Sequence, residues 1–302
     1  MRRWSTIVLW AVIVALLVAG ATSATYPRQV RAYLTHWKGS PGSTTAYIPA
    51  AIEPGLVRIA VAGDVGDSGT RLARTAAAIS RAAGPYGYDG LLLLGDNVYP
   101  SGDPQLLRET VLDPFAALLA SGTELMAIVG NHDVRRGNGP RQMAALGMDG
   151  LWWSTEIGDV LFVGLDSNQP DNAEQRRWLQ RTLDDTTARW KIVSLHHPPY
   201  SAGYQGSSVD VRDAFATTFE RFGVQLVLSG HDHDYQRSVP IRGTTYVVSG
   251  AAAGSRRTSE RDFTAASFSW HHFLELDIYA DRLIGRAVNQ SGRVADVWTL
   301  SH

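Results

Sequence analysis

The chain has 302 residues, 44% of them hydrophobic, which is enough to bury a large core in one main domain. The formal net charge is -1, and this balance excludes the strongly basic surface that binds a nucleic-acid backbone, so we expect no duplex nucleic acid as a partner. The chain contains no Cys, which excludes disulfides, thiolate catalysis, cysteine-ligated zinc and a lipoprotein anchor.

The first 24 residues have the pattern of a targeting segment. Arg2 and Arg3 precede an aliphatic run from Ile7 to Ala19, and small residues follow it. A basic start, an apolar centre and a small-residue exit are typical of a secretory signal peptide. The uncharged span 4–24 also approaches the roughly 20 residues that a membrane helix needs, so an uncleaved membrane anchor is the alternative. We therefore expect a secreted or extracytoplasmic protein, whose only membrane contact would be through residues 4–24.

Residues 25–55 are rich in Pro, Gly, Ser and Thr and predict an extended linker or arm. Beyond them, strand-like runs alternate with helical ones. The predicted strands are Leu56–Ala62, Leu91–Leu94 and Leu125–Val129, and the predicted helices cover 71–83 and 112–120. This alternation is typical of a parallel sheet covered by helices.

The middle of the chain has a different pattern. Two strand-like runs, 152–157 and 160–165, are joined by Gly158-Asp159, which favours a hairpin. The later runs predict helices at 175–183 and 211–222 and strands at 191–195, 224–228, 244–249, 273–279 and 282–289. We expect an α/β fold of two packed mixed β-sheets flanked by helices, with residues 56–302 as the catalytic domain.

Nitrogen and oxygen donors follow five of the predicted strands. Asp96, for example, comes directly after the buried run Leu91–Leu94 and Gly95. The carboxyl ends of strands in open α/β sheets border the crevice where ligands bind. The candidates at these strand ends are Asp64, Asp96, Tyr99, Asn131, His132, His196, His197, His231 and His233. One such residue alone is more often a cap or a turn residue, but five strand ends with donors predict a single site.

The donor types indicate a metal site. His231 and His233 are two residues apart, so in extended backbone they point the same way and can serve one site. Mixed imidazole and carboxylate donors suit zinc, manganese or iron, whereas magnesium and calcium prefer oxygen alone. About seven donors are too many for one tetrahedral ion but suit a pair of ions, which a carboxylate can bridge through its two oxygens.

At these residues the chain resembles the purple acid phosphatases, a branch of the calcineurin-like metallophosphoesterases. The five similar blocks, in order, are Gly63–Gly66, Gly95–Tyr99, Gly130–Asp133, Val193–His196 and Gly230–His233. Most of the superfamily has His at the position of Gly66, and in the purple branch a Tyr at the position of Tyr99 supplies the compensating ligand. The resemblance implies the αββα sandwich of that superfamily.

The resemblance also implies a ligand set for two metal ions. The residues implied to hold Fe(III) are Asp64, Tyr99 and His233. The residues implied to hold a divalent ion, Fe, Zn or Mn, are Asn131, His196 and His231, with Asp96 bridging both ions. Three anionic donors offset the charge of such a pair only in part, so the centre should attract phosphate.

We therefore predict an exported phosphatase that hydrolyses phosphate monoesters of small molecules by in-line attack of metal-bound hydroxide. His132, beside the implied ligand Asn131, is the candidate to bind phosphate or to protonate the leaving group. An exported phosphodiesterase acting on nucleotides or lipid head groups is the alternative within enzymes. A non-catalytic, surface-tethered binding protein with the same fold is the alternative from another class.

The chain departs from the family pattern at Gln205, where related phosphatases carry a second His. Gln cannot donate a proton as an acid, so His197 or Tyr204 becomes the candidate for that task. His197 is equally a candidate for supporting the neighbouring ligand. Arg237 could contact phosphate, but a structural ion pair is the preferred interpretation.

Overall fold

The structure is a computed structural model that describes residues 45–47, 53 and 55–302. The predicted signal peptide or anchor, residues 1–24, and most of the predicted arm lie outside the described residues. Within that arm, β1 (Thr45–Ala46) pairs antiparallel with β14 (Arg293–Ser301). None of the helices that the structure describes has the length and apolar character needed to span a membrane.

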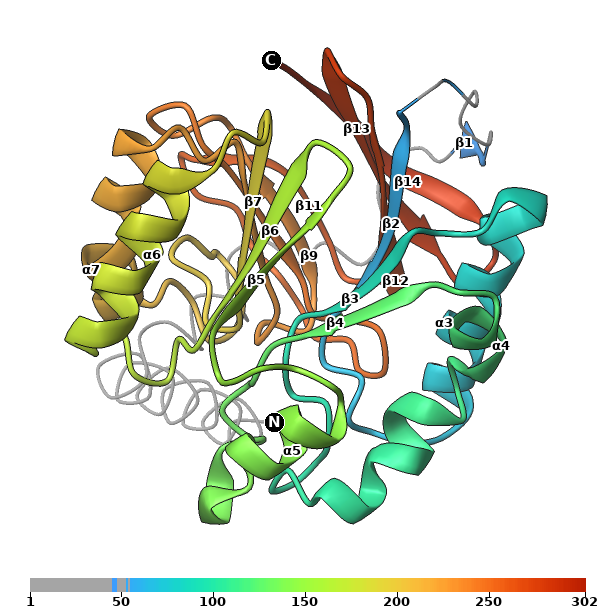
Figure 1. The fold of residues 1–302 in the computed structure, drawn as a ribbon. Helices are drawn as coiled ribbons and strands as arrows, with labels where there is room; N and C mark the ends of the chain where they lie inside the picture. Colours follow the sequence, from blue (N-terminus) through green and yellow to red (C-terminus); the bar gives the residue numbers. More distant parts are fainter. Residues whose placement is uncertain (1–44, 48–52, 54) are drawn as a thin grey trace, which may run out of the picture.

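Two seven-stranded sheets form the centre of the molecule (Figure 1). In the first sheet, the parallel strands are β2 (Val57–Ala62), β3 (Gly90–Leu93) and β4 (Glu124–Ala127). Its antiparallel strands are β12 (His272–Ile278), β13 (Arg282–Asn289) and β14. Mixed pairing of this kind confirms one part of the predicted α/β fold.

The second sheet is also mixed. Its parallel strands are β6 (Val160–Leu165), β7 (Trp190–Leu195), β8 (Leu226–Ser229) and β10 (Thr245–Ser249). Its antiparallel strands are β5 (Trp153–Ile157), β9 (Tyr235–Ser238) and β11 (Thr264–Phe268). The predicted hairpin is confirmed, because β5 and β6 pair antiparallel.

Helices cover the outer faces of both sheets (Figure 1). The helices beside the first sheet are α3 (Thr70–Ala83) and α4 (Ala116–Ala120), and those beside the second are α6 (Ala173–Asp185) and α7 (Val209–Arg221). Leu72, Ala76, Ile79 and Ala83 lie three or four positions apart on α3 and are buried, as expected for a helix with one apolar face.

Three hydrophobic cores hold these four layers together. The core between the sheets includes Ile59 and Met126 from the first sheet and Phe162 and Trp190 from the second. The other two cores lie between each sheet and its helices. Strands β2 and β3 are buried at every residue, because a helix layer covers one face and the other sheet covers the opposite face, which explains their unbroken apolar sequence.

Some predicted elements were wrong or missing. The helix predicted over 112–120 is interrupted: a π-helical turn covers Arg108–Leu112, and α4 begins only at Ala116. Pro114 lies between them, and Pro has no N–H to donate and disfavours helical backbone in the residue before it. The short helix α5 (Gly139–Ala145) and the strands β9, β11 and β14 were not predicted.

Candidate metal centre

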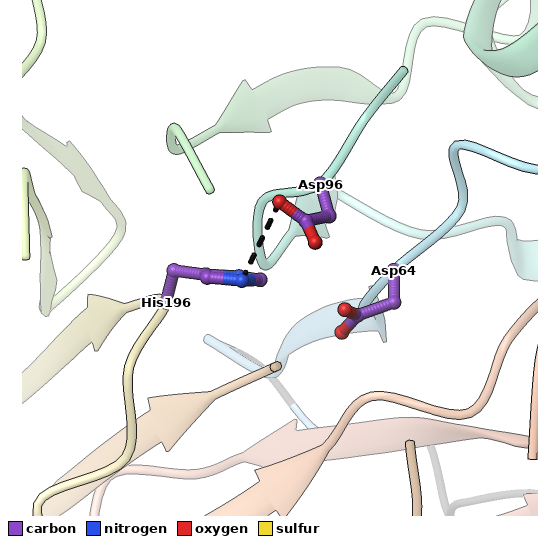
Figure 2. Close-up of side chains that lie close together, drawn as sticks. All are labelled: Asp64, Asp96 and His196. Atoms are coloured by element: carbon purple, nitrogen blue, oxygen red, sulfur yellow. Dashed lines mark ion pairs between the residues drawn. The ribbon is translucent and has the colours of Figure 1, made fainter. Parts of the chain in front are cut away.

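The predicted ligands meet where both sheets present the carboxyl ends of their parallel strands. Asp64 and Asp96 follow β2 and β3 of the first sheet, and His196 follows β7 of the second. Figure 2 shows these three side chains pointing toward one another. One ligand atom from each lies within 4.8 Å of the others, and all three residues are buried. The packing of the two sheets therefore brings together residues that are 132 positions apart in the sequence.

Backbone strain is concentrated at this point of the fold. Asp64, Asp96 and His231 adopt left-handed backbone conformations with φ of 58°, 50° and 70°. Such conformations cost about 1–3 kcal/mol each in residues other than Gly and persist where the surroundings fix them. The surroundings do so here: the backbone N–H of His231 donates to Asp64 Oδ2 at 2.9 Å, and that of His132 donates to Asp96 Oδ1 at 2.9 Å.

Two glycines allow the close approach of these carboxylates. A Cβ at Gly130 would lie 2.1 Å from Asp96 Oδ1, and a Cβ at Gly230 would lie 2.6 Å from Asp64 Oδ2. Any side chain at either position would push a carboxylate out of place. This packing explains why a Gly directly precedes both Asn131 and His231 in the sequence.

The donor atoms form two groups. In the first group, Asn131 Oδ1 lies 3.2 Å from His196 Nε2 and 3.0 Å from His231 Nδ1. In the second group, the Tyr99 hydroxyl lies 3.1 Å from Asp64 Oδ1 and 3.1 Å from His233 Nε2, and the last two atoms are 3.3 Å apart.

Asp96 stands next to both groups. Its Oδ1 lies 3.5 Å from His196 Nε2 in the first group, and its charge acts on Tyr99 in the second. The structure thus brings all seven predicted ligands together. They form the two groups of three that the family resemblance implies, with Asp96 as the seventh ligand next to both groups. Their roles as ligands stay predictions.

The donor set fits two metal ions. Metal–nitrogen and metal–oxygen bonds of about 2.0–2.2 Å place adjacent ligand atoms roughly 3.0–3.5 Å apart around one ion, and the distances within both groups match. His196 Nδ1 lies 2.8 Å from the carbonyl oxygen of Leu94. Because a carbonyl can only accept, Nδ1 carries a proton, so loss of the other proton would leave the Nε2 lone pair facing the centre.

The acids of the centre have no guanidinium or ammonium partner among the described residues. Among the residues that the structure describes, the ion pairs of Asp64 and Asp96 are with His side chains, and no Arg or Lys takes part. Buried carboxylates are stable when positive charge pairs with them, and here imidazoles alone provide it within the protein. Metal cations supply that charge in sites built from the same donor types.

The pKa values reflect this demand for positive charge. Burial opposes ionisation of Asp96, but His196 and the hydrogen bonds that Asp96 accepts outweigh it and hold the pKa of Asp96 well below its usual range. Burial alone would lower the pKa of His196, yet the Asp96 charge raises it to about 10. Burial and then the charges of Asp64 and Asp96 raise the pKa of Tyr99 far above its usual range. A cation bound between these groups would instead lower the pKa of Tyr99.

His132 lies beside the donor groups and faces a cavity of about 520 Å³. Its Nδ1 donates to the carbonyl oxygen of Pro100 at 2.8 Å, and its Nε2 lies 4.0 Å from Asp96 Oδ2. The edge of its ring packs against Tyr99, with 4.7 Å between the ring centres. Its Nε2 therefore lies on the side of the predicted ligands, and the guanidinium of Arg135 donates to it at 3.4 Å.

His197 occupies a different environment. It is not among the residues that line this cavity, and its Nδ1 lies 2.9 Å from the hydroxyl of Ser167. Its ring packs against His231, with 4.6 Å between the ring centres. Burial, and then the neighbouring charge of His196, lower the pKa of His197 to about 4. This placement fits a side chain that supports a ligand, and its catalytic role stays a prediction.

The remaining sequence candidates are placed as follows. Gln205 lines the cavity, whereas Tyr204 does not. The guanidinium of Arg237, on β9, donates to the carboxylate of Asp296 at 2.7 and 3.1 Å. The preferred interpretation of Arg237, a structural ion pair, is confirmed.

The sequence interpretation missed two buried acids that support the site. Asp133 accepts hydrogen bonds from the backbone N–H groups of Gly130, Asn97 and Val98, so it ties the loop after β3 to the loop after β4. Asp232, between His231 and His233, accepts hydrogen bonds from the backbone N–H groups of Gln205 and Gly206, so it ties the loop after β8 to the loop after β7. The signal was present in the sequence, since both acids lie inside the Gly-led blocks that carry the predicted ligands.

Comparison with known proteins agrees with this geometry. A profile of the calcineurin-like phosphoesterase family matches residues 57–235. Purple acid phosphatase 21 of Arabidopsis thaliana is 28% identical over 209 residues, which cover 61% of this chain and 46% of that protein. Tartrate-resistant acid phosphatase type 5 of Oryctolagus cuniculus is 26% identical over 196 residues, which cover 53% of this chain and 60% of that protein. The chain thus spans less than two thirds of either relative.

A solved structure shows the same fold. The purple acid phosphatase from seeds of yellow lupin, Lupinus luteus, superimposes with a TM-score of 0.70 at 19% sequence identity. The match covers 85% of this chain and 55% of the lupin chain. At this identity the likeness concerns the arrangement of sheets and helices.

Proposed function

The chain belongs to the calcineurin-like phosphoesterase family, in its purple acid phosphatase-like branch, and from this premise we propose that it hydrolyses phosphate monoesters at a centre of two metal ions. The single observation that carries the proposal is the pairing of donor groups. Asn131 Oδ1 lies 3.0–3.2 Å from the donor nitrogens of His196 and His231, the three donor atoms of the other group lie 3.1–3.3 Å apart, and Asp96 lies next to both groups.

We further propose which ions the two groups hold. The group that would hold Fe(III) consists of Asp64, Tyr99 and His233, and the group that would hold a divalent ion consists of Asn131, His196 and His231. When bound, the two cations would neutralise the charge of a phosphate group and make water a stronger nucleophile. A phenolic oxygen is a hard anionic donor, and this chemistry favours the trivalent ion beside Tyr99.

His132 would handle the proton of the leaving group. With Nδ1–H held by the carbonyl of Pro100, a protonated ring presents its second proton on Nε2, toward the cavity. That proton can pass to the alcohol oxygen as its bond to phosphorus breaks. The side chain of Gln205, on another wall of the cavity, can orient a bound group by hydrogen bonding but cannot transfer a proton.

The test is a comparison of ester types. Protein reconstituted with iron plus zinc or manganese should hydrolyse p-nitrophenyl phosphate with a kcat/KM at least about tenfold above that for bis(p-nitrophenyl) phosphate. A reversed preference would make the protein a phosphodiesterase. No hydrolysis of either ester by protein with two bound metal ions would contradict the proposal and favour a binding protein.

We also propose that the protein is exported. The support is the sequence pattern of residues 1–24, which lie outside the described residues. In N-terminal sequencing, protein collected outside the cytoplasm should begin close to residue 25 if the segment is cleaved. It should begin at Met1 or Arg2 if the segment stays as an anchor. Protein found only in the cytoplasm would contradict export.

A further inference from the structure

Two loops form one wall of the cavity beside the donor groups, and we call this wall the outer wall. Its lining residues are Gln205, Gly254, Ser255 and Arg256. The backbone N–H of Arg256 donates to the carbonyl of His233 at 2.7 Å. A Cβ at Gly254 would lie 2.8 Å from His233 Nδ1. The part of the wall that carries Arg256 is therefore held directly against a predicted metal ligand.

The other part of the outer wall is held by Asp232. This buried carboxylate accepts hydrogen bonds from the backbone N–H groups of Gln205 at 2.6 Å and Gly206 at 3.1 Å. His231 and His233 line the cavity on either side of Asp232 in the sequence, whereas Asp232 contacts the loop. One short segment thus positions both the predicted ligands and the wall next to them.

Arg256 is the cationic group of this wall. Its guanidinium lies over the ring of Tyr204, with 5.3 Å between the guanidinium carbon and the ring centre, and its side chain is exposed to the cavity. In the part of the chain that the structure describes, no carboxylate pairs with it. A guanidinium stacked on an aromatic ring keeps its N–H edge available, and its planar fork binds phosphate or carboxylate with two hydrogen bonds.

The other rim arginine is partly compensated. Arg71 lies 3.9 Å from Asp67, but their side chains are 64% and 61% exposed, so this pair is weak in water. Because Asp67 and Arg71 both line the cavity, the two charges together add little net potential to its mouth. The cavity of about 520 Å³ is within the range that holds a whole small molecule, so it has room for the group attached to the phosphate.

We propose that Arg256, stacked on Tyr204 and next to Gln205, binds a second anionic group on the leaving-group side of the substrate. The substrates that this wall favours are phosphate monoesters whose alcohol part carries a further phosphate or carboxylate. The proposal rests on the proposed phosphatase function, because the substrate has this orientation only when the donor groups hold the phosphate that is cleaved. Arg256 then determines which alcohol part binds well and takes no part in bond cleavage.

The first test compares two substrates that differ in one charge. 4-Carboxyphenyl phosphate and 4-carbamoylphenyl phosphate have nearly the same shape, so the ratio of their kcat/KM values reports the charge preference. The wild type should favour the carboxylate by about tenfold, as expected for one charge-assisted contact. Arg256→Gln should bring the ratio close to 1, and Arg256→Lys should keep part of the preference.

The matched control is Arg257→Gln. Arg257 is the next residue, is exposed and does not line the cavity, so this variant should keep the wild-type ratio. Equal ratios in the wild type and in Arg256→Gln would overturn the proposal. Loss of the preference in Arg257→Gln would also overturn the proposal, because the preference would then reflect the general surface charge.

The second test measures binding without turnover. Calorimetry with (4-carboxybenzyl)phosphonate and (4-carbamoylbenzyl)phosphonate should give about tenfold tighter binding of the carboxylate to the wild type, and no difference for Arg256→Gln. A preference in binding without hydrolysis of either ester would sink the phosphatase function and leave the anion site standing. Hydrolysis of both esters with no preference in binding would overturn the anion site and leave the phosphatase function standing.

Discussion

Two buried polar clusters lie at opposite ends of strand β2. The metal cluster, at the carboxyl end, contains the seven predicted ligands from Asp64 to His233. The ion-pair cluster, at the amino end, consists of Arg58, Glu275, Asp277 and Arg286 together with the hydroxyls of Tyr47 and Tyr88. Both clusters bury two carboxylates, but only the second provides guanidinium groups for them.

The distances show how complete the compensation is in the ion-pair cluster. Arg58 lies 3.1 Å from Glu275 and 3.3 Å from Asp277, and Arg286 contacts both acids. The hydroxyls of Tyr47 and Tyr88 each donate to Glu275 at 2.6 Å. Two positive charges thus balance two negative ones with protein groups alone.

The comparison shows what separates a functional cluster from a structural one. Buried charge is costly unless it is paired, and the ion-pair cluster meets that demand within the chain. The metal cluster combines an acid-rich set, imidazole lone pairs and strained backbone at Asp64, Asp96 and His231. Its two carboxylates pair with imidazoles and have no guanidinium partner among the described residues, so the arrangement leaves room for an added cation.

The largest effect is expected from Asp96→Asn. The change removes the carboxylate that stands next to both donor groups, so hydrolysis of a phosphate monoester should fall by about 10³-fold or more. The free energy of unfolding of the metal-free protein should also fall, because the pKa of Asp96 lies below its usual range and the change removes the ion-pair partner of His196. Steady-state kinetics and urea unfolding check the two parts. Hydrolysis at the wild-type rate by the Asp96→Asn protein would place Asp96 outside the metal cluster.

A different outcome is expected from Arg58→Met in the ion-pair cluster. Removing one partner leaves Glu275 and Asp277 undercompensated, so the free energy of unfolding should fall by about 3–5 kcal/mol. Metal content per folded molecule should not change. Arg74→Met, on the exposed face of α3, is the control and should change stability by less than about 0.5 kcal/mol. If Arg58→Met lowered metal content instead, the two clusters would not be independent.

His132→Ala tests whether His132 belongs to the metal cluster. His132 faces the cavity but belongs to neither donor group, so turnover should fall by about 10²-fold while metal content stays at the wild-type level. Esters with better leaving groups should be less affected, because they need less protonation. Loss of metal in this variant, measured by elemental analysis, would make His132 part of the cluster.

The smallest effect is expected from Arg237→Met. Although Arg237 lies only four residues after His233, it pairs with Asp296, so it belongs with the compensated charges. The free energy of unfolding should fall by about 1–3 kcal/mol, as for other hydrogen bonds between charged groups. The inhibition constant of inorganic phosphate should not change. Weaker inhibition by phosphate in this variant would show that Arg237 reaches the substrate.

Much of the fold follows from patterns in the sequence. The apolar runs that became β2, β3, β6, β7 and β8 are buried on both faces, so their composition alone marks them. In contrast, β9 has the sequence YQRS and β11 the sequence TAASF, with little apolar content. Those strands exist because neighbouring strands pair with them, which no local pattern reveals.

In the candidate site, too, some residues could be predicted from the sequence and others could not. The predicted ligands follow Gly-led strand ends, so their convergence could be anticipated from the sequence. Arg256 could not, because its loop after β10 has no motif, and its position depends on a backbone hydrogen bond to His233. Nor could the sequence distinguish the acids that pair with arginines, Glu275 and Asp277, from the acids that pair with imidazoles, Asp64 and Asp96. That difference arises only when strands distant in sequence pack together.

The most direct test of the central claim is the number of metal ions in the active protein. Elemental analysis of wild-type protein with full phosphatase activity should give two ions per chain, one of them iron. With Fe(III) beside Tyr99, the protein should show a visible charge-transfer band that Tyr99→Phe abolishes. Full activity with one ion per chain or none would contradict the account, because Asp96 would then have no second ion to bridge.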